Sequence, residues 1–407
     1  MQAPTPTTPD DATVVALVRD ATAAPSMHNA QPWLFRYRRG TGTLALYADL
    51  SRAMPLADPS TRGLHLGCGA ALFNLRVAAA HQGLHPEITL LPGGELEPEL
   101  LAVIHLAHGG PYTVSDRPAR QPTATGAAAG RGSGRAAAGA GTALRGPAVA
   151  GAAGAVELPT ARPPLGVPVG RLGAPAALHP AVHTRHTVRL PFADRPIPPV
   201  VRAELVAAAT AEGAELSFLR GAHRQFVLDL TRDAEGYDHM DAAREAERQR
   251  WLRPAPDAPS GDPRHGADDG PRQRRPRDGV PATAFGPVPA SGAAPVRDFA
   301  GRAASAGRRF ADFERHPQLA LLRTRGDHPL DWLLAGQGLE RVLLEATRHG
   351  LRASFATQAL EWPELRWLLR DPQSGPGHVH MVLRLGYGPP GTPTPRRPLR
   401  EVLAVTD

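Results

Sequence analysis

A short loop near the N-terminus carries four side chains that can form hydrogen bonds, and two prolines bound it. The prolines are Pro25 and Pro32, and the hydrogen-bonding side chains are those of Ser26, His28, Asn29 and Gln31. Proline lacks a backbone N–H and keeps the residue before it out of a helix, so the helix predicted over 11–23 must end before this loop. A loop held between regular elements can present polar groups to a flat polar ligand. For any single residue, a capped turn is an equally good interpretation, because serine and asparagine are common in turns.

A second candidate group lies in the other half of the chain, where Arg185, Thr187 and Arg189 occupy every second position. Residues two apart on an extended segment point to the same side. Arginine binds phosphate through two parallel hydrogen bonds, and a hydroxyl adds another donor, so the pattern suits a phosphate group. The alternative is a solvated basic strand, since arginine is abundant throughout this chain.

The elements predicted around these two groups form a mixed pattern. The first half contains a helix over 11–23, strands over 33–39 and 43–48, a core helix over 58–82, and strands over 87–91 and 101–107. The second half contains a helix over 200–211, a strand over 215–219, a charged helix over 222–250, a strand over 319–324, a helix over 329–349, a loop over 353–360, a helix over 363–370 and a strand over 379–385. This pattern predicts an α+β fold.

Composition divides the chain into three parts. An N-terminal half over 11–112 and a C-terminal half over 177–403 have the composition of folded protein. Between them, 113–176 is rich in small residues and has too little large apolar surface to offset the entropy of ordering, so it is predicted to be a low-complexity linker. Out-of-frame translation would give a similar composition, and the sequence does not separate the two. A second segment, 253–278, is predicted to be an exposed loop or lid.

Charge and composition exclude several functions. The 407 residues carry a formal net charge of +7, and no residue is a lysine. Much of the basic excess falls in the two segments that do not look folded, and no nucleic-acid motif is present, so we expect no nucleic-acid binding. No apolar run has transmembrane length and no signal peptide is evident, so we expect no membrane association and a cytoplasmic location. The single cysteine, Cys68, excludes an intrachain disulfide, and its pairing with His65 supplies too few ligands to predict a metal site.

The motifs resemble those of the nitroreductase family. The loop string Pro-Ser-x-x-Asn-x-Gln-Pro-Trp is similar to the family's flavin-edge loop. Arg-x-Thr-x-Arg before Phe192 resembles the family's opening, and Pro395-Arg396-Arg397-Pro398-Leu399 resembles its ending. A standard member carries the opening first and the loop one helix later, whereas this chain has the loop in its N-terminal half and the opening in its C-terminal half. The resemblance, which is closest to the double-length Acg-like branch, implies a nitroreductase-like fold of two half-repeats that form an intrachain pseudo-dimer with one composite site.

The resemblance implies an FMN site, and its residues can be assigned position by position. Arg185, Thr187 and Arg396 would bind the phosphate region, with Arg397 as a neighbouring alternative, and Arg189 would lie nearer the ring. Pro25, Ser26 and Asn29 would contact the isoalloxazine from the other half, while Gln31 would brace their loop. His28 departs from the family's common small residue and would either support the site or cap the loop. Thr357 and Gln358 would lie along the reactive face.

The resemblance also implies the chemistry. In this family the flavin carries the reaction, so no catalytic side chain is expected. NAD(P)H is the implied electron donor, and nitroaromatics, quinones or similar small molecules are the implied acceptors. A Gly-x-Gly-x-x-Gly motif is absent, which is no objection because the family binds nicotinamide over the flavin. The chain is expected to act as a monomer with an internal pseudo-dimer. The rival interpretation is a non-catalytic protein that sequesters FMN beneath a cover.

Overall fold

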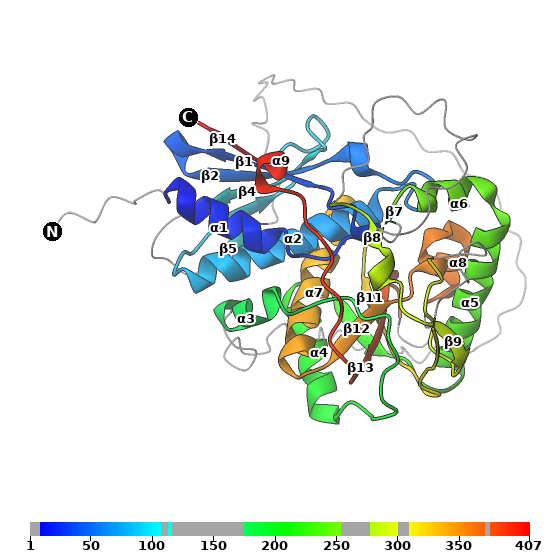
Figure 1. The fold of residues 1–407 in the computed structure, drawn as a ribbon. Coiled ribbons are helices and arrows are strands. Elements are labelled where there is room, and N and C mark those ends of the chain that lie inside the picture. Colours follow the sequence, from blue (N-terminus) through cyan, green and yellow to red (C-terminus); the bar gives the residue numbers. More distant parts are fainter. Residues whose placement is uncertain (1–8, 107–112, 116–174, 254–276, 300–308, 371–374) are drawn as a thin grey trace, which may run out of the picture.

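The computed structural model describes residues 9–106, 113–115, 175–253, 277–299, 309–370 and 375–407. Two sheets lie on either side of a pair of central helices, one helix from each half of the chain (Figure 1). Both sheets are wholly or mainly antiparallel, and helices pack against them, which confirms the predicted α+β class. Most of the predicted linker and most of the predicted lid, 116–174 and 254–276, lie outside the described residues.

The six-stranded sheet belongs mainly to the N-terminal half. Its order is β14 (Leu403–Thr406), β1 (Trp33–Arg38), β2 (Thr43–Ala48), β4 (Leu100–His105), β3 (Glu87–Leu90) and β5 (Thr113–Ser115). Along β1, Trp33, Phe35 and Tyr37 are buried while Arg36 and Arg38 are exposed, the alternation of a strand with one face on a core. Helix α1 (Asp11–Ala21) packs against α2 beside this sheet, and the Asp10 carboxylate caps it by accepting from the Thr13 N–H at 2.8 Å.

The four-stranded sheet belongs to the C-terminal half. Its order is β12 (Arg352–Phe355), β13 (His378–Gly386), β11 (Gln318–Thr324) and β6 (Glu215–Phe218). The prediction of a loop over 353–360 is wrong. Strand β12 covers its first residues and pairs with β13, from Arg352 opposite Gly386 to Phe355 opposite Leu383. A 3₁₀ turn, Gln358–Glu361, follows. Pairing across the sheet, rather than local periodicity, forms this short strand.

The remaining helices and strands surround the C-terminal sheet and the tail. The charged helix predicted over 222–250 is two helices, α5 (Gly221–Met240) and α6 (Ala242–Gln249), because extended Asp241 interrupts it and caps α6. The other helices are α3 (His179–Val182), α4 (Pro199–Ala211), α8 (Pro363–Leu368) and α9 (Leu399–Val402). The short strands are β7 (Leu252–Arg253), β8 (Val280–Pro281), β9 (Val288–Ser291) and β10 (Phe310–Asp312).

Helices α2 (Arg62–His81) and α7 (Pro329–Arg348) cross at the centre of the molecule (Figure 1). Each has 20 residues, and glycine stands at the eighth position of each, Gly69 in α2 and Gly336 in α7. A Cβ on Gly69 would overlap the carbonyl oxygen of Leu333, and a Cβ on Gly336 would overlap that of Leu66. The two backbones therefore approach closely only because both crossing positions are glycine.

The C-terminal tail joins the two halves. After β13 the chain returns to the N-terminal sheet, where β14 pairs in parallel with β1 from Leu403 opposite Phe35 to Thr406 opposite Arg38. The last strand of the chain is therefore a strand of the first half, a connection that the predicted division at 403 does not contain. Among the described residues, the structure contains no helix with the length and apolarity needed to cross a bilayer.

Candidate functional site

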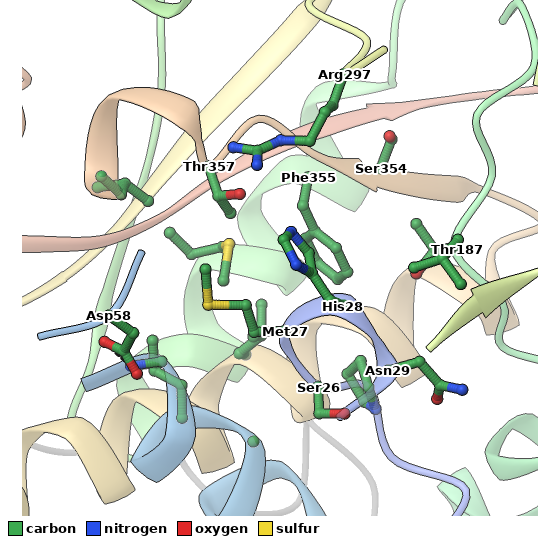
Figure 2. A pocket seen from close by; sticks show the side chains of 18 of the residues that line it. Ser26, Met27, His28, Asn29, Asp58, Thr187, Arg297, Ser354, Phe355 and Thr357 are labelled. Atoms are coloured by element: carbon green, nitrogen blue, oxygen red, sulfur yellow. Dashed lines mark hydrogen bonds between the residues drawn. The ribbon is translucent and has the colours of Figure 1, made fainter. Parts of the chain in front are cut away.

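One pocket lies where the two halves meet, between the loop at 25–29, the segment at 185–189, the end of β12 and the tail. It encloses about 1210 Å³, counting the open space at its mouth. Eight of the eleven residues predicted from the sequence line it: Pro25, Ser26, Asn29, Arg185, Thr187, Arg189, Thr357 and Arg396. Figure 2 shows Thr187 and Asp58 on opposite sides of the pocket, with His28 and Phe355 between them.

The loop at 25–31 is held in an unusual backbone conformation. His28, Asn29 and Gln31 all have positive φ, at 46°, 56° and 54°, which is uncommon for residues other than glycine. The Ser26 hydroxyl accepts a hydrogen bond from the Gln31 N–H at 2.9 Å and closes the turn. The loop is a built structure rather than a generic turn, and it carries His28 and Asn29 to the pocket wall.

Asn29 joins three segments that are far apart in sequence. Its amide nitrogen donates to the carbonyl of Gly279 at 2.9 Å and to that of Pro395 at 3.1 Å. Its amide oxygen accepts from Arg396 at 3.1 Å. In this structure the side chain of Asn29 is therefore fully used in connecting the loop to the tail and to the segment after 277.

Three predicted residues do not line the pocket. Gln31 is completely buried, donates to the Arg277 carbonyl at 2.8 Å and accepts from the Arg397 N–H at 2.7 Å, so it braces its loop. The Arg397 guanidinium turns away to Asp49 at 3.2 Å. Gln358 is buried beneath the wall. The structure thus separates Arg396, which faces the pocket, from its neighbour Arg397.

Two arginines form one end of the pocket, Arg185 buried and Arg396 partly buried. Arg185 is 5% exposed and donates to the carbonyl of Ala23 at 3.1 Å. Arg396 donates to backbone carbonyls at the end of α1 and beyond, including Ala24 at 3.1 Å. Burial, and then the charge of Arg185, lower the pKa of Arg396 to about 9. Two cations held this close and partly removed from water favour an anionic ligand, because an anion would offset both their desolvation and their mutual repulsion.

Thr187 and Arg189 extend along the pocket from these arginines. Thr187 forms an isolated parallel bridge with Ala353 beside β12, and the N–H of Val188 donates to the Ala353 carbonyl at 2.8 Å. This contact keeps the segment extended, so Arg185, Thr187 and Arg189 all reach the same pocket, as their spacing predicts. The guanidinium of Arg189 lies over the ring of Phe299 at 4.7 Å. Burial, and then nearby Arg297, lower the pKa of Arg189 to about 10.

Sequence reasoning missed three residues that the segment 277–299 brings to the pocket, Val280, Arg297 and Phe299. Arg297 is buried and donates to Glu361 at 2.7 Å, and the ring of Phe299 meets the edge of His28 with centroids 5.6 Å apart. No motif marks this segment, so only its contacts reveal its part in the site.

His28 is the most exceptional side chain of the pocket. It is 9% exposed, and among the described residues neither ring nitrogen has a hydrogen-bond partner. Burial, followed by the charges of Arg297, Arg248 and Arg189, lowers the pKa of His28 well below its ordinary value. The imidazole is therefore neutral at physiological pH and offers one unused donor and one unused acceptor to a ligand.

His65 and Cys68 have structural partners on α2. The His65 Nδ1 lies 2.7 Å from the Thr61 carbonyl, and its ring packs against Trp332. The Cys68 thiol is fully buried and donates to the Pro32 carbonyl at 3.3 Å, and burial raises its pKa. These contacts account for both residues as part of the packing around α2.

The fold and the site together define a class: an α+β protein with an arginine-lined pocket built by both halves of one chain.

No family model matches the chain. Among curated proteins of Mycobacterium tuberculosis (strain ATCC 25618 / H37Rv), it is 27% identical over 406 residues to one named "Putative NAD(P)H nitroreductase Rv3131", covering 97% of this chain and 92% of that protein. It is 26% identical over 400 residues to "Putative NAD(P)H nitroreductase acg", covering 96% and 95%. A third relative, "Uncharacterized protein Rv3127", is 24% identical over 391 residues, covering 95% and 91%. The resemblance to double-length, Acg-like nitroreductases is thereby confirmed over nearly the whole chain.

Solved structures give weaker likenesses. A BluB-like flavoprotein from Clostridium difficile 630 has a TM-score of 0.34 at 12% identity and covers 55% of this chain and 96% of its own. The FMN- and NADPH-dependent nitroreductase NfnB from Sphigopyxis sp. strain HMH has a TM-score of 0.32 at 18% identity, with the same coverage.

Proposed function

We propose that the protein is an FMN-dependent oxidoreductase of the nitroreductase type. It would take hydride from NAD(P)H and deliver it to a nitroaromatic, a quinone or a similar small acceptor. One observation carries the proposal: the loop at 25–29, the arginines at 185 and 189, and the arginine at 396 come from three distant parts of the chain and line one pocket. The names of the full-length relatives support the same activity.

The residues present fit FMN. Its phosphate needs cations, and Arg185 and Arg396 lie side by side, both bonded to the carbonyl of Ala23. Its ring needs a flat wall and hydrogen-bonding edges, and the pocket supplies Phe355 and the unpartnered nitrogens of His28. When bound, FMN would supply the hydride-transfer chemistry at its N5 atom.

The chain would then bind, orient and shield the cofactor. Arg185, Thr187 and Arg396 would hold the phosphate region, and Arg189 would place a cation nearer the ring, where reduction adds negative charge. Pro25 and Ser26 would border the ring from the other half. Asn29 would act at one remove, because its amide is already bonded to Gly279, Pro395 and Arg396.

The segment 277–299 favours a second candidate function, in which the flavin is bound but covered. Val280, Arg297 and Phe299 line the pocket. The segment is fastened to the loop, because Asn29 bonds to Gly279 and Gln31 bonds to Arg277. A fastened wall of this kind would bar nicotinamide from the ring, leaving a protein that sequesters FMN.

A visible spectrum of the purified protein distinguishes the two functions. We expect flavin absorption that bleaches when NADPH is added without oxygen and returns when a nitroaromatic or quinone is added. Absorption that persists with NADPH would favour the covered flavin. A protein that binds no added FMN would contradict both functions.

We also propose a monomer whose two halves form an internal pseudo-dimer, working in the cytoplasm. The matched lengths of α2 and α7 and their crossing at Gly69 and Gly336 support this arrangement. Sedimentation equilibrium should give the mass of one chain, with one FMN bound for each chain. Two FMN molecules per chain would contradict a single composite site.

A further inference from the structure

A carboxyl group is buried directly behind the two arginines of the pocket. Glu340, on α7, is 0% exposed, and its Oε1 lies 3.4 Å from the Nε of Arg185. Within the described residues, neither carboxylate oxygen of Glu340 nor the Nε of Arg185 meets a hydrogen-bond partner in good geometry. A carboxylate without hydrogen bonds in a core costs several kcal/mol unless charge compensates it. The nearby guanidinium groups supply that compensation here.

The side chains that act on Glu340 are two guanidinium groups and one amide. Arg185 belongs to the segment between α3 and α4, and Arg396 belongs to the C-terminal tail. Asn74, on α2, lies beside Glu340. Two further arginines of this core, Arg76 on α2 and Arg341 on α7, form ion pairs with Glu212 instead. Arg185 and Arg396 are thus the cations that face Glu340, and they are the same two that line the pocket.

We propose that Glu340 is the resident counter-ion of Arg185 and Arg396, and that it takes up a proton when a phosphate group binds to them. The inference rests on the proposed FMN site. Without a ligand, the carboxylate shares the charge of the two guanidinium groups. A phosphate dianion bound to the same groups repels the carboxylate. In a buried site this repulsion favours the protonated, neutral form of the carboxyl group. Glu340 thereby couples phosphate binding to pH and positions Arg185.

The direction of the pH effect follows from the same geometry. Burial raises the pKa of Glu340 to about 7, against a smaller opposing effect from Arg185. Above that pH the free protein carries the carboxylate, and binding a phosphate dianion must draw a proton from solvent. A phosphomonoester is mainly dianionic above about pH 6. The affinity for FMN should therefore fall as pH rises above about 7.5, by up to about tenfold per pH unit for one linked proton.

Calorimetry of the apoprotein measures this proton directly. FMN is titrated at about pH 8 in buffers of different ionisation enthalpy, which gives the number of protons taken up. We expect uptake approaching one proton in the wild type and only a small residual uptake in Glu340→Gln, from the lowered pKa of Arg396. Riboflavin, which has the ring but no phosphate, should bind without proton uptake. Glu345→Gln is the matched control, because Glu345 is also on α7 but bonds to Arg348 at 3.0 Å; it should behave as the wild type.

The outcomes separate the two proposals. If neither FMN nor riboflavin binds, the proposed function fails. If FMN binds but Glu340→Gln takes up as many protons as the wild type, or riboflavin takes up as many as FMN, the inference about Glu340 is overturned. If Glu340→Gln does not fold, infrared difference spectra of the wild type with inorganic phosphate replace it. A new band of a protonated carboxyl would support the inference, and its absence would overturn it.

Discussion

The side-chain oxygen of Asn29 accepts a hydrogen bond from Arg396 at 3.1 Å, although the two residues are 367 positions apart. The same amide donates to the carbonyls of Gly279 and Pro395. One side chain near the N-terminus therefore fastens both the tail and the segment after 277. The pocket exists because these three segments meet, so the first prediction concerns this junction.

Replacing Asn29 with alanine should destabilise the protein by about 1–3 kcal/mol. Three hydrogen bonds are lost, the bond to buried Gly279 among them, and alanine tolerates the φ of 56° less well than asparagine. Urea unfolding monitored by tryptophan fluorescence measures the change. Gln225→Ala, which removes an exposed side-chain contact to Asp229, should cost far less. Equal effects of the two substitutions would show that Asn29 does not hold the junction.

Replacing Arg185 with alanine should weaken FMN binding by about 1.5–3 kcal/mol, the scale of a hydrogen bond to a charged group. Quenching of flavin fluorescence on titration gives the dissociation constant. The control is Arg232→Ala on α5, whose side chain is 66% exposed and pairs with Asp229. Riboflavin affinity should change much less than FMN affinity. Unchanged FMN affinity would remove Arg185 from the site.

Replacing Gly336 with alanine should destabilise the protein strongly, by about 2 kcal/mol or more, because the new Cβ would overlap the Leu66 carbonyl. Gly236→Ala provides a matched control in α5, where an added Cβ meets nothing within 4 Å. That substitution should stabilise slightly, by up to about 1 kcal/mol, since alanine is the better helix former. The melting temperatures of the two variants should therefore shift in opposite directions. A tolerated Gly336→Ala would contradict the close crossing of α2 and α7.

The stability of the protein should fall when the pH drops below about 6.5. Burial, with the charges of nearby arginines, holds the pKa values of His28 and His380 well below their ordinary value. Below the unfolded pKa of about 6.5, the unfolded chain binds protons that the folded chain does not. The free energy of unfolding therefore decreases as the pH falls. Urea unfolding at about pH 7.5, 6.5 and 5.5 measures the slope.

One variant measures how much of the pH dependence of stability comes from His28. His28→Asn keeps a small polar side chain that suits the φ of 46° at this position. It should lower the slope by up to one proton, whereas replacing exposed His105 should lower it less. An unchanged slope in His28→Asn would show that His28 is not held neutral in the folded protein.

Local spacing was enough to predict which side chains of the segment at 185–189 share a side. Alternation alone places Arg185, Thr187 and Arg189 on one side of an extended segment, and all three reach the pocket. The same reasoning could not separate Arg396 from Arg397, because their difference lies in what each guanidinium meets. Arg396 meets carbonyls near the pocket, and Arg397 meets Asp49.

The sequence by itself determined the elements and the chemistry that they carry. Apolar periodicity defines α2 and α7, two prolines isolate the loop at 25–31, and the paired arginines indicate a phosphate group. Only the tertiary structure decided that β14 completes the first sheet, that Phe299 enters the pocket and that Glu340 lies behind Arg185. The physical reason is that these relationships join residues far apart in the chain. Their energy comes from burial and charge at the contact, which no local pattern records.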